Sequence, residues 1–342
     1  MDTLFDLAPV RPTTKQVAQL VKGRGAAGLP SAIRRGDAVT YQEVVCRSAL
    51  NAVQGMPFRW TLNPYRGCTH GCHYCFARRY QSQLELDAGD GFSSIVFVKV
   101  NFPEVLAREL ARPGWANELV ALGTATDPYQ PIEGRYRLTR RSLEAIAARP
   151  TPVSIVTKGP MIVRDKDVLV DLSRRVRCTV CFSVPTVDDE AWARLEPGTA
   201  HPRQRLRAVK ELREAGIDAG VLMAPVVPGL TTPLAKLERT VKAIAEHDPA
   251  FVGAMVLHLD GATRDHFMGF LAREFPHLTA GYDRLYATKY APKRYSSQVH
   301  AAIEALKGKY GLAGRRTSER EPDDGEETPV EDRQYAFAWS NG

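Results

Sequence analysis

The sequence predicts an α/β protein whose parallel strands form a partial (βα)6 TIM-like barrel, with a helical C-terminal cap and a disordered acidic tail. From about residue 94, short apolar runs rich in β-branched residues alternate with helical segments, which is typical of parallel βαβ units. About six such units follow one another, which favours a barrel-like sheet over a helix bundle. The chain has 342 residues and is 44% hydrophobic, enough for a sizeable buried core.

The individual elements are read from apolar runs and from residues that begin or end helices. The predicted strands are 58–65, 94–102, 117–125, 151–158, 176–184, 217–227 and 251–259. The predicted helices are 103–110, 138–149, 165–175, 202–216 and 232–247. Pro103 stands at the start of the first helix, Thr139 is a candidate cap of the second, and Gly216 ends the fourth.

The chain divides into four regions. Residues 46–262 form the predicted barrel, after a poorly patterned leader over 1–45 and before a helical extension over 263–312. The tail over 313–342 is predicted to be disordered, because its run 319–332 carries eight acids against one arginine. The chain has a net charge of +7, so the residues outside that run carry +14. This basic body suits a polyanion such as nucleic acid, or the Arg-rich surface of a soluble enzyme.

The compartment follows from what the sequence lacks. No apolar run approaches the roughly 18 residues that a membrane span needs. The N-terminus lacks the basic and then apolar pattern of a secretion signal. We therefore expect a cytoplasmic monomer without membrane association, in which clustered cysteines bind metal or do redox work rather than form disulfides.

Three of the six cysteines fall in one short loop with the spacing C-x3-C-x2-C: Cys68, Cys72 and Cys75. The loop follows the first predicted strand, so it lies at the end of the barrel where catalytic loops gather. Three thiolates can hold three corners of a cubane iron–sulfur cluster and leave one iron open. A zinc site is the alternative, with His70 or His73 as fourth ligand. Tyr74, directly before the last cysteine, can shield a cluster from water.

Several motifs resemble those of a known family. "NPYRGCTHGCHYCFAR", "TATDPYQPIE", "TKGPMIVRDKDVL", "FSVPTVDDEAWARLEPGTAHPRQRL" and "AGIDAGVLMAPVVPGL" resemble, in order, the radical S-adenosylmethionine (SAM) superfamily and its spore photoproduct lyase-like branch. The resemblance covers about residues 58–275. It implies that Cys68, Cys72 and Cys75 ligate a [4Fe-4S] cluster that cleaves SAM reductively to a 5′-deoxyadenosyl radical, with an electron donor such as ferredoxin or flavodoxin.

Candidate contacts to SAM lie at the predicted strand ends. Lys158 ends its strand, so its ammonium can pair with the SAM carboxylate. Thr126 and Asp127 end the preceding strand, and an acid there can accept from the SAM amine or from substrate. Ser183 resembles a ribose contact of the branch. Asn101 ends the second predicted strand and is expected, with its neighbour Lys99, at the same mouth.

The sequence departs from the branch at one catalytic position. Spore photoproduct lyases carry a hydrogen-donating cysteine near the end of the third strand, and the stretch "ALGTATDPY" has threonines there, Thr124 and Thr126. Tyr129 can substitute as a donor, so Asp127 and Tyr129 are the predicted catalytic residues. We therefore expect SAM cleavage without efficient repair of spore photoproduct.

Other cysteines and histidines are expected to be structural. Cys178 and Cys181 lie three apart on one predicted strand and are expected in the core. His258, in an apolar run, is expected to be a core histidine. Three classes of function fit the sequence: a radical SAM enzyme, with nucleic acid or another anion as candidate substrate; a zinc-stabilised nucleic-acid-binding protein; and an iron–sulfur electron carrier. The barrel disfavours the carrier, which needs no large cavity.

Overall fold

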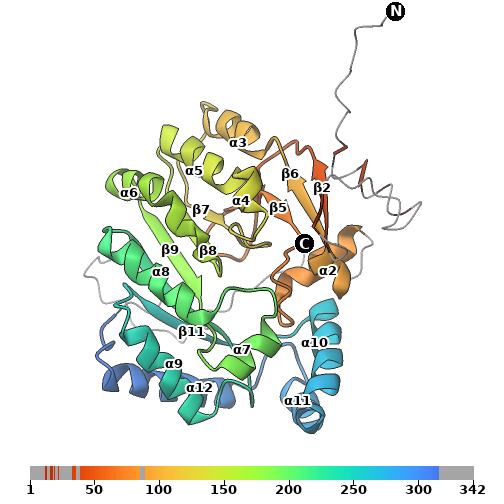
Figure 1. The fold of residues 1–342 in the computed structure, drawn as a ribbon, viewed down its shortest axis with the longest axis vertical. Helices are drawn as coiled ribbons and strands as arrows, with labels where there is room; N and C mark the ends of the chain where they lie inside the picture. Colours follow the sequence, from red (N-terminus) through yellow and green to blue (C-terminus); the bar gives the residue numbers. More distant parts are fainter. Residues whose placement is uncertain are drawn as a thin grey trace, which may run out of the picture.

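A seven-stranded sheet forms the centre of the computed structural model, which describes residues 39–84 and 89–315 and short N-terminal pieces at 12–13, 16–17, 19, 22 and 33–35 (Figure 1). The strand order is β11-β10-β9-β8-β7-β4-β3. Six of these strands run parallel, and only the edge strand β3 is antiparallel to its neighbour. The strands are β3 (Leu50–Ala52), β4 (Trp60–Leu62), β7 (Val120–Leu122), β8 (Val153–Thr157), β9 (Cys178–Ser183), β10 (Asp218–Val226) and β11 (Val252–Val256). The predicted partial barrel is thereby confirmed.

Helices line the outside of this sheet, where Figure 1 shows them as an arc around the strands. They are α3 (Phe102–Leu110), α5 (Leu138–Ala148), α6 (Lys166–Arg175), α8 (Pro202–Glu214) and α9 (Leu234–Ala245). Shorter helices in the connections are α4 (Glu133–Tyr136), η3 (Pro160–Asp165) and α7 (Asp189–Leu195). Gly216, at φ +80°, follows the end of α8 as predicted. Thr139 is not a cap, because it lies within the first turn of α5, and its hydroxyl donates to the Pro128 carbonyl (2.6 Å).

A second, four-stranded sheet lies beside the barrel, with the order β1-β2-β6-β5. Its strands are β1 (Ile33–Arg35), β2 (Val39–Val44), β5 (Tyr65–Arg66) and β6 (Ile95–Lys99), and α2 (Asp90–Ser94) leads into β6. The prediction that 94–102 is a barrel strand is therefore wrong. An apolar, β-branched run indicates a buried strand but does not say which sheet it joins, and β2, from the predicted leader, supplies the parallel partner.

The C-terminal extension is helical, as predicted. It consists of α10 (Gly261–Glu274), η4 (Pro276–Leu278), α11 (Thr279–Leu285) and α12 (Lys293–Lys309). α12 packs against α9 and β11, and α10 packs against η2 (Phe76–Leu84) beside the cysteine loop. None of the described helices is long and apolar enough to cross a membrane. Most of the predicted acidic tail, residues 316–342, lies outside the described residues.

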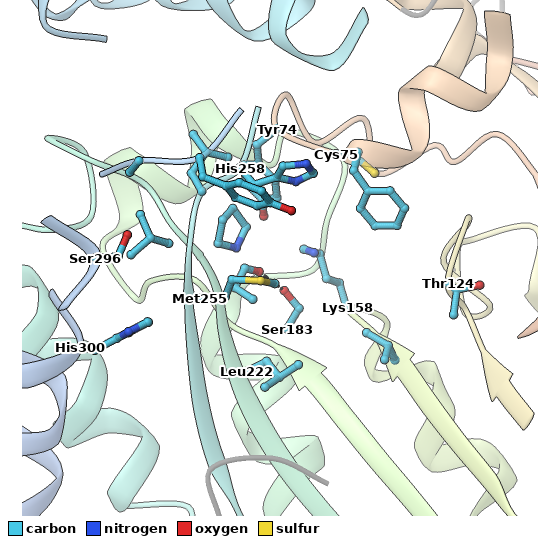
Figure 2. Close-up of a pocket in the computed structure, with 18 of the residues that line it drawn as sticks. Tyr74, Cys75, Thr124, Lys158, Ser183, Leu222, Met255, His258, Ser296 and His300 are labelled. Carbon is cyan, nitrogen blue, oxygen red and sulfur yellow. Dashed lines mark hydrogen bonds between the residues drawn. The ribbon is translucent and has the colours of Figure 1, made fainter. Parts of the chain in front are cut away.

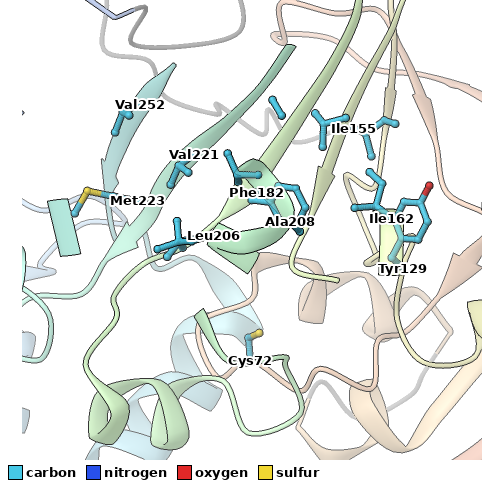
Figure 3. Packing of buried hydrophobic residues seen from close by; sticks show 14 of the residues in the cluster. Cys72, Tyr129, Ile155, Ile162, Phe182, Leu206, Ala208, Val221, Met223 and Val252 are labelled. Carbon is cyan, nitrogen blue, oxygen red and sulfur yellow. The ribbon is translucent and has the colours of Figure 1, made fainter. Parts of the chain in front are cut away.

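The core lies between the strands and the outer helices. In Figure 3, Phe182 and Val221 from adjacent strands appear with Leu206 and Ala208 from α8, all in one buried cluster. Cys178 and Cys181 are both buried, as predicted. The packed strands fix the positions of the loops at their carboxyl ends, where the site is built.

Candidate active site

The cysteine loop runs from Gly67 to Cys75, between β5 and η2. Cys68 and Cys72 are buried and Cys75 is half-buried. Gly67 has φ +81°, and a Cβ there would lie 2.4 Å from the Ile95 carbonyl oxygen. Only glycine fits this turn, which lets the loop bend tightly against the second sheet.

Arg78 holds the loop from within. Its side chain is 2% exposed, and its guanidinium donates to the carbonyls of Gly71 (2.7 Å), Cys72 (3.0 Å) and Gly89 (2.7 Å). Backbone carbonyls that turn away from a sheet or helix need such partners when they are buried. The loop is therefore pre-shaped by the protein.

Replacing Arg78 with methionine should destabilise the fold, because three backbone carbonyls around the loop would lose a charged donor, and those of Cys72 and Gly89 would keep only backbone donors at 3.2 and 3.3 Å. We expect the free energy of unfolding in urea to fall by about 3 kcal/mol, since the loss of a hydrogen bond to a charged group costs about 1.5–3 kcal/mol. Arg79→Met is the matched control, because Arg79 is the neighbouring arginine and is partly exposed, with a 3.8 Å ion pair to Asp260 and a 3.4 Å hydrogen bond to the Tyr80 hydroxyl among its contacts; its cost should be about 1 kcal/mol or less. Equal stability of the two variants would contradict this role of Arg78.

Thr126 and Gln130 support the loop from the barrel side. The Thr126 hydroxyl donates to the Gly67 carbonyl (2.7 Å). The Gln130 amide donates to the same carbonyl (3.2 Å) and accepts from the Thr69 backbone (3.1 Å). Thr126, predicted to contact SAM, thus lies behind the loop rather than in the cavity described below. Gln130 was missed, although it lies in the quoted motif "TATDPYQPIE".

Asp127 connects the end of β8 to the loop. Its carboxylate accepts from the Thr157 hydroxyl (2.7 Å) and from the Lys158 backbone (2.7 Å), and it lies 3.3 Å from His70 Nδ1. Burial raises the pKa of Asp127, but His70 and these donors lower it to about 2. Burial lowers the pKa of His70, but Cys68 and Asp127 raise it to about 10. Asp127 does not line the cavity, so its geometry suits positioning of Lys158.

Two other predicted residues lie away from the cavity. Tyr129 is 2% exposed and packs in the core with Ile162 (Figure 3), so it is not placed to donate hydrogen to a ligand. Burial raises the pKa of its phenol well above its usual range. The Asn101 amide bonds both the N–H (2.8 Å) and the carbonyl (2.9 Å) of Cys46, and Lys99 Nζ donates to the Asn63 carbonyl (2.7 Å). Lys99 ends β6 in the second sheet, and Asn101 is the N-cap residue of α3 just after it, so neither lines the cavity, which corrects their predicted place at the mouth.

A cavity of about 270 Å3 opens at the carboxyl ends of the barrel strands (Figure 2). One wall carries Tyr74, Cys75, Lys158 and Ser183, all from the cysteine loop or strand ends. Much of its lining is apolar, and no aspartate or glutamate in the part of the chain that the structure describes lines it. The remaining lining residues include Thr124, Leu222, Ala224, Pro225, Met255, His258, Tyr290, Ala291, Ser296 and His300.

Among the described residues, Lys158 is the one lysine or arginine that lines this cavity, and Figure 2 shows its nitrogen directed toward the interior. It lies over the Tyr74 ring, 5.6 Å from the centroid, and 3.9 Å from the Glu196 carboxylate. Burial lowers the pKa of Lys158, but the negative charges of Cys72 and Glu196 outweigh burial and raise it. The cavity therefore presents a charged ammonium to whatever it binds.

Three of the predicted site residues, Tyr74, Lys158 and Ser183, lie together at the cavity. The Ser183 hydroxyl donates to the Ala224 carbonyl (2.8 Å) and keeps an oxygen lone pair for a ligand. His258 corrects the prediction of a core histidine: it is half-buried, lines the cavity and stacks on Tyr290 at 5.1 Å. The wall from the C-terminal extension was missed, because it lacks a motif.

The donor set can be tested against a metal group. Among the described residues, no three His, Cys, Asp or Glu side chains converge on one ion. That does not fit a mononuclear zinc site, whose four ligands share one ion. His70 faces Asp127, and His73 Nδ1 lies 3.0 Å from His266. A cubane differs, because its cysteine ligands bind three separate irons. Three thiols on one short, largely buried loop fit that group.

Comparison with known proteins gives the family. A family model described as the Radical SAM superfamily matches residues 62–244. An uncharacterized protein of Mycobacterium tuberculosis (strain ATCC 25618 / H37Rv) is 42% identical over 282 residues, 81% of this chain and 83% of the relative. A radical SAM Nα-GlyT isomerase of Pseudomonas phage M6 is 28% identical over 171 residues, 49% of this chain and 33% of the isomerase.

A solved structure agrees with the observed fold. Spore photoproduct lyase complexed with dinucleoside spore photoproduct superposes with a TM-score of 0.63 at 14% identity, over 88% of this chain and 92% of the lyase. At this identity the likeness concerns the fold. The family model matches more than half of the chain and includes the cysteine loop and the strand ends of the cavity. The chain therefore belongs to the radical SAM superfamily.

Proposed function

We propose that this protein is a radical SAM enzyme that holds a [4Fe-4S] cluster on Cys68, Cys72 and Cys75 and binds SAM in the adjoining cavity. One observation carries the proposal: a half-buried thiol of the C-x3-C-x2-C loop, Cys75, and the ammonium of Lys158 line the same cavity. When bound, the cluster and SAM supply the 5′-deoxyadenosyl radical that takes hydrogen from a substrate.

The chain's own residues bind and orient the cofactor. Lys158 offers an ammonium to the SAM carboxylate, a charge-assisted contact. Ser183 offers a hydroxyl to the ribose. Asp127 fixes the backbone of Lys158 through the 2.7 Å hydrogen bond at the end of β8. Tyr74 and the apolar lining keep water from a reactive radical, which protects it from side reactions.

The test is electron paramagnetic resonance on anaerobically reconstituted and reduced protein, with and without SAM. The proposal predicts a cluster signal that changes when SAM is added, because SAM would bind the open iron. A signal that SAM leaves unchanged would indicate an electron carrier. Colourless protein with stoichiometric zinc and no iron uptake would indicate the zinc alternative.

The proposed substrate is a polyanion such as nucleic acid. The support for this substrate is the net charge of +14 outside the acidic run, which suits a polyanion. The isomerase relative in Pseudomonas phage M6 is a radical SAM enzyme by name, and its name describes an isomerisation rather than a repair reaction.

We propose that the protein is a cytoplasmic monomer. It would receive its electron from a protein such as ferredoxin or flavodoxin.

Reconstituted protein should cleave SAM but should not repair spore photoproduct over multiple turnovers. The lyase route needs a thiol to return hydrogen to the product radical, and Cys75, assigned to the cluster, is the one cysteine among the lining residues. Thr124 lines the cavity near the end of β7, and a hydroxyl O–H bond is too strong to serve. The assay quantifies thymidylyl-thymidine restored from the dinucleoside lesion, with spore photoproduct lyase as positive control. Multiple-turnover repair would refute this prediction.

A further inference from the structure

Glu196 lies next to the cavity, in the segment 195–201 that connects α7 to α8. This segment contacts the cysteine loop directly, because the Gly198 N–H donates to the His70 carbonyl (3.0 Å). A Cβ on Gly198 would lie 2.2 Å from the Thr69 carbonyl oxygen, so only glycine fits this contact. The position of Glu196 is therefore fixed relative to the loop.

The Glu196 carboxylate connects three side chains around the cavity. Glu196 is 2% exposed, and its Oε1 accepts from the Tyr74 hydroxyl. The same oxygen lies 3.9 Å from Lys158 Nζ, which is too long for a hydrogen bond. Its Oε2 pairs with Arg205 at 2.5 Å. Glu196 therefore influences Lys158 through charge without occupying its N–H donors.

Arg205 satisfies Glu196 from behind. Arg205 is 0% exposed, and its other N–H groups donate to the carbonyls of Ser183 (2.9 Å) and Ala200 (2.9 Å). The one negative charge of Glu196 is thus matched by a fixed guanidinium. The Lys158 ammonium makes no hydrogen bond with any residue that the structure describes, and it is the positive charge left over. Its side chain is 16% exposed, and only toward a cavity without acidic side chains among the described residues, which favours an anionic group of a bound ligand as its partner.

We infer that Glu196 is the positioning residue of the cavity: it orients the Lys158 ammonium and the Tyr74 ring, so that Lys158 meets the carboxylate of the bound ligand. Arg205 completes the arrangement, because it prevents Glu196 from taking the ammonium for itself. The inference rests on the proposed function and deepens it. None of the sequence motifs assigned this role to Glu196 or Arg205.

The test compares SAM with decarboxylated SAM, which lacks the carboxylate. Both dissociation constants are measured on reconstituted wild type, Glu196→Gln, Lys158→Met and the double variant, at equal iron and sulfide content. The preference for SAM is the ratio of the dissociation constant of decarboxylated SAM to that of SAM. Glu196→Gln should reduce this ratio about tenfold, a coupling typical of residues in one network. Lys158→Met should reduce it at least as much, and the double variant should show no further loss.

Glu190→Gln is the matched control, because Glu190 lies on α7, just before the segment that carries Glu196, with a side chain that is 72% exposed; this variant should prefer SAM as strongly as wild type does. If Glu196 had only a structural role, Glu196→Gln would weaken the binding of SAM and of decarboxylated SAM equally. That result, which leaves the preference unchanged, would overturn the inference. If Glu196→Gln does not fold, Tyr74→Phe removes the hydrogen bond that Tyr74 donates to Glu196 and should reduce the preference for SAM about threefold; no reduction would overturn the inference. Wild type that binds neither compound would overturn the proposed function itself.

Discussion

Cys72→Ala should abolish the iron–sulfur chromophore and all SAM cleavage. Anaerobic reconstitution of wild type should yield about four irons and four sulfides per chain, the content of one cubane. Cys72 is buried in the loop that Arg78 and Gly67 shape, so the protein holds its thiol in a fixed position. The loss should be complete, because the cluster is the source of the electron. Cys68→Ala and Cys75→Ala should behave alike.

Cys178→Ala is the control for this experiment. Cys178 is also buried, but it lies on β9 in the core, outside the lining of the cavity. This variant should keep its iron, sulfide and visible absorption, apart from a modest loss of stability from the removed side chain. A Cys72→Ala protein that retains a full cluster would contradict the assignment of the three ligands.

Lys158→Met should keep the cluster and weaken SAM binding by roughly ten- to a hundredfold. Loss of one hydrogen bond between charged groups costs about 1.5–3 kcal/mol. Methionine preserves length and apolar contact with the Tyr74 ring, so the change isolates the ammonium. Calorimetric titration of reconstituted protein with SAM measures the effect directly.

Lys166→Met provides the comparison for Lys158. Lys166 lies on the outer helix α6, where its ammonium pairs with Glu211 at 2.8 Å and its side chain is 41% exposed. An exposed pair of this kind contributes little, so SAM affinity should stay at the wild-type value. If Lys158→Met bound SAM with unchanged affinity, Lys158 would not be a contact of the SAM carboxylate but an ordinary residue at the end of a strand.

The barrel was predictable because its signal is local and repeated. Apolar strands of the right length alternate with helices, and parallel pairing follows from that order. The run at 94–102 was misassigned for the same reason: its apolar pattern is equally typical of either sheet. Its partner β2 lies about fifty residues earlier in a region without clear pattern, so pairing across that distance was not visible.

The site was predictable where a residue directly ends a barrel strand. Lys158 and Ser183 follow or end β8 and β9, and both line the cavity. Asp127 lies further from its strand, and the intervening turn directs its carboxylate back to β8. Tyr129, in the same turn, enters the core. Spacing along a loop does not say which way a side chain points, and this accounts for the misplaced residues.

Long-range contacts were beyond prediction. Glu196 meets Tyr74 across 122 positions of the chain, through a loop that is defined by backbone contact with the cysteine loop. In the sequence, Glu196 and Arg205 are charged residues of the kind usually found on the surface, and only the structure shows that both are buried. The helical extension was predicted as a cap, but its contribution of Tyr290, Ser296 and His300 to the cavity was not.

The proposed reaction of this chain is the reductive cleavage of SAM at its cysteine loop. Its product 5′-deoxyadenosine can be quantified directly by chromatography after anaerobic incubation of reconstituted protein with SAM and dithionite. We predict 5′-deoxyadenosine and methionine in equal amounts from wild type, and none from Cys72→Ala. Protein that carries a full cluster, binds SAM and still forms no 5′-deoxyadenosine would contradict it.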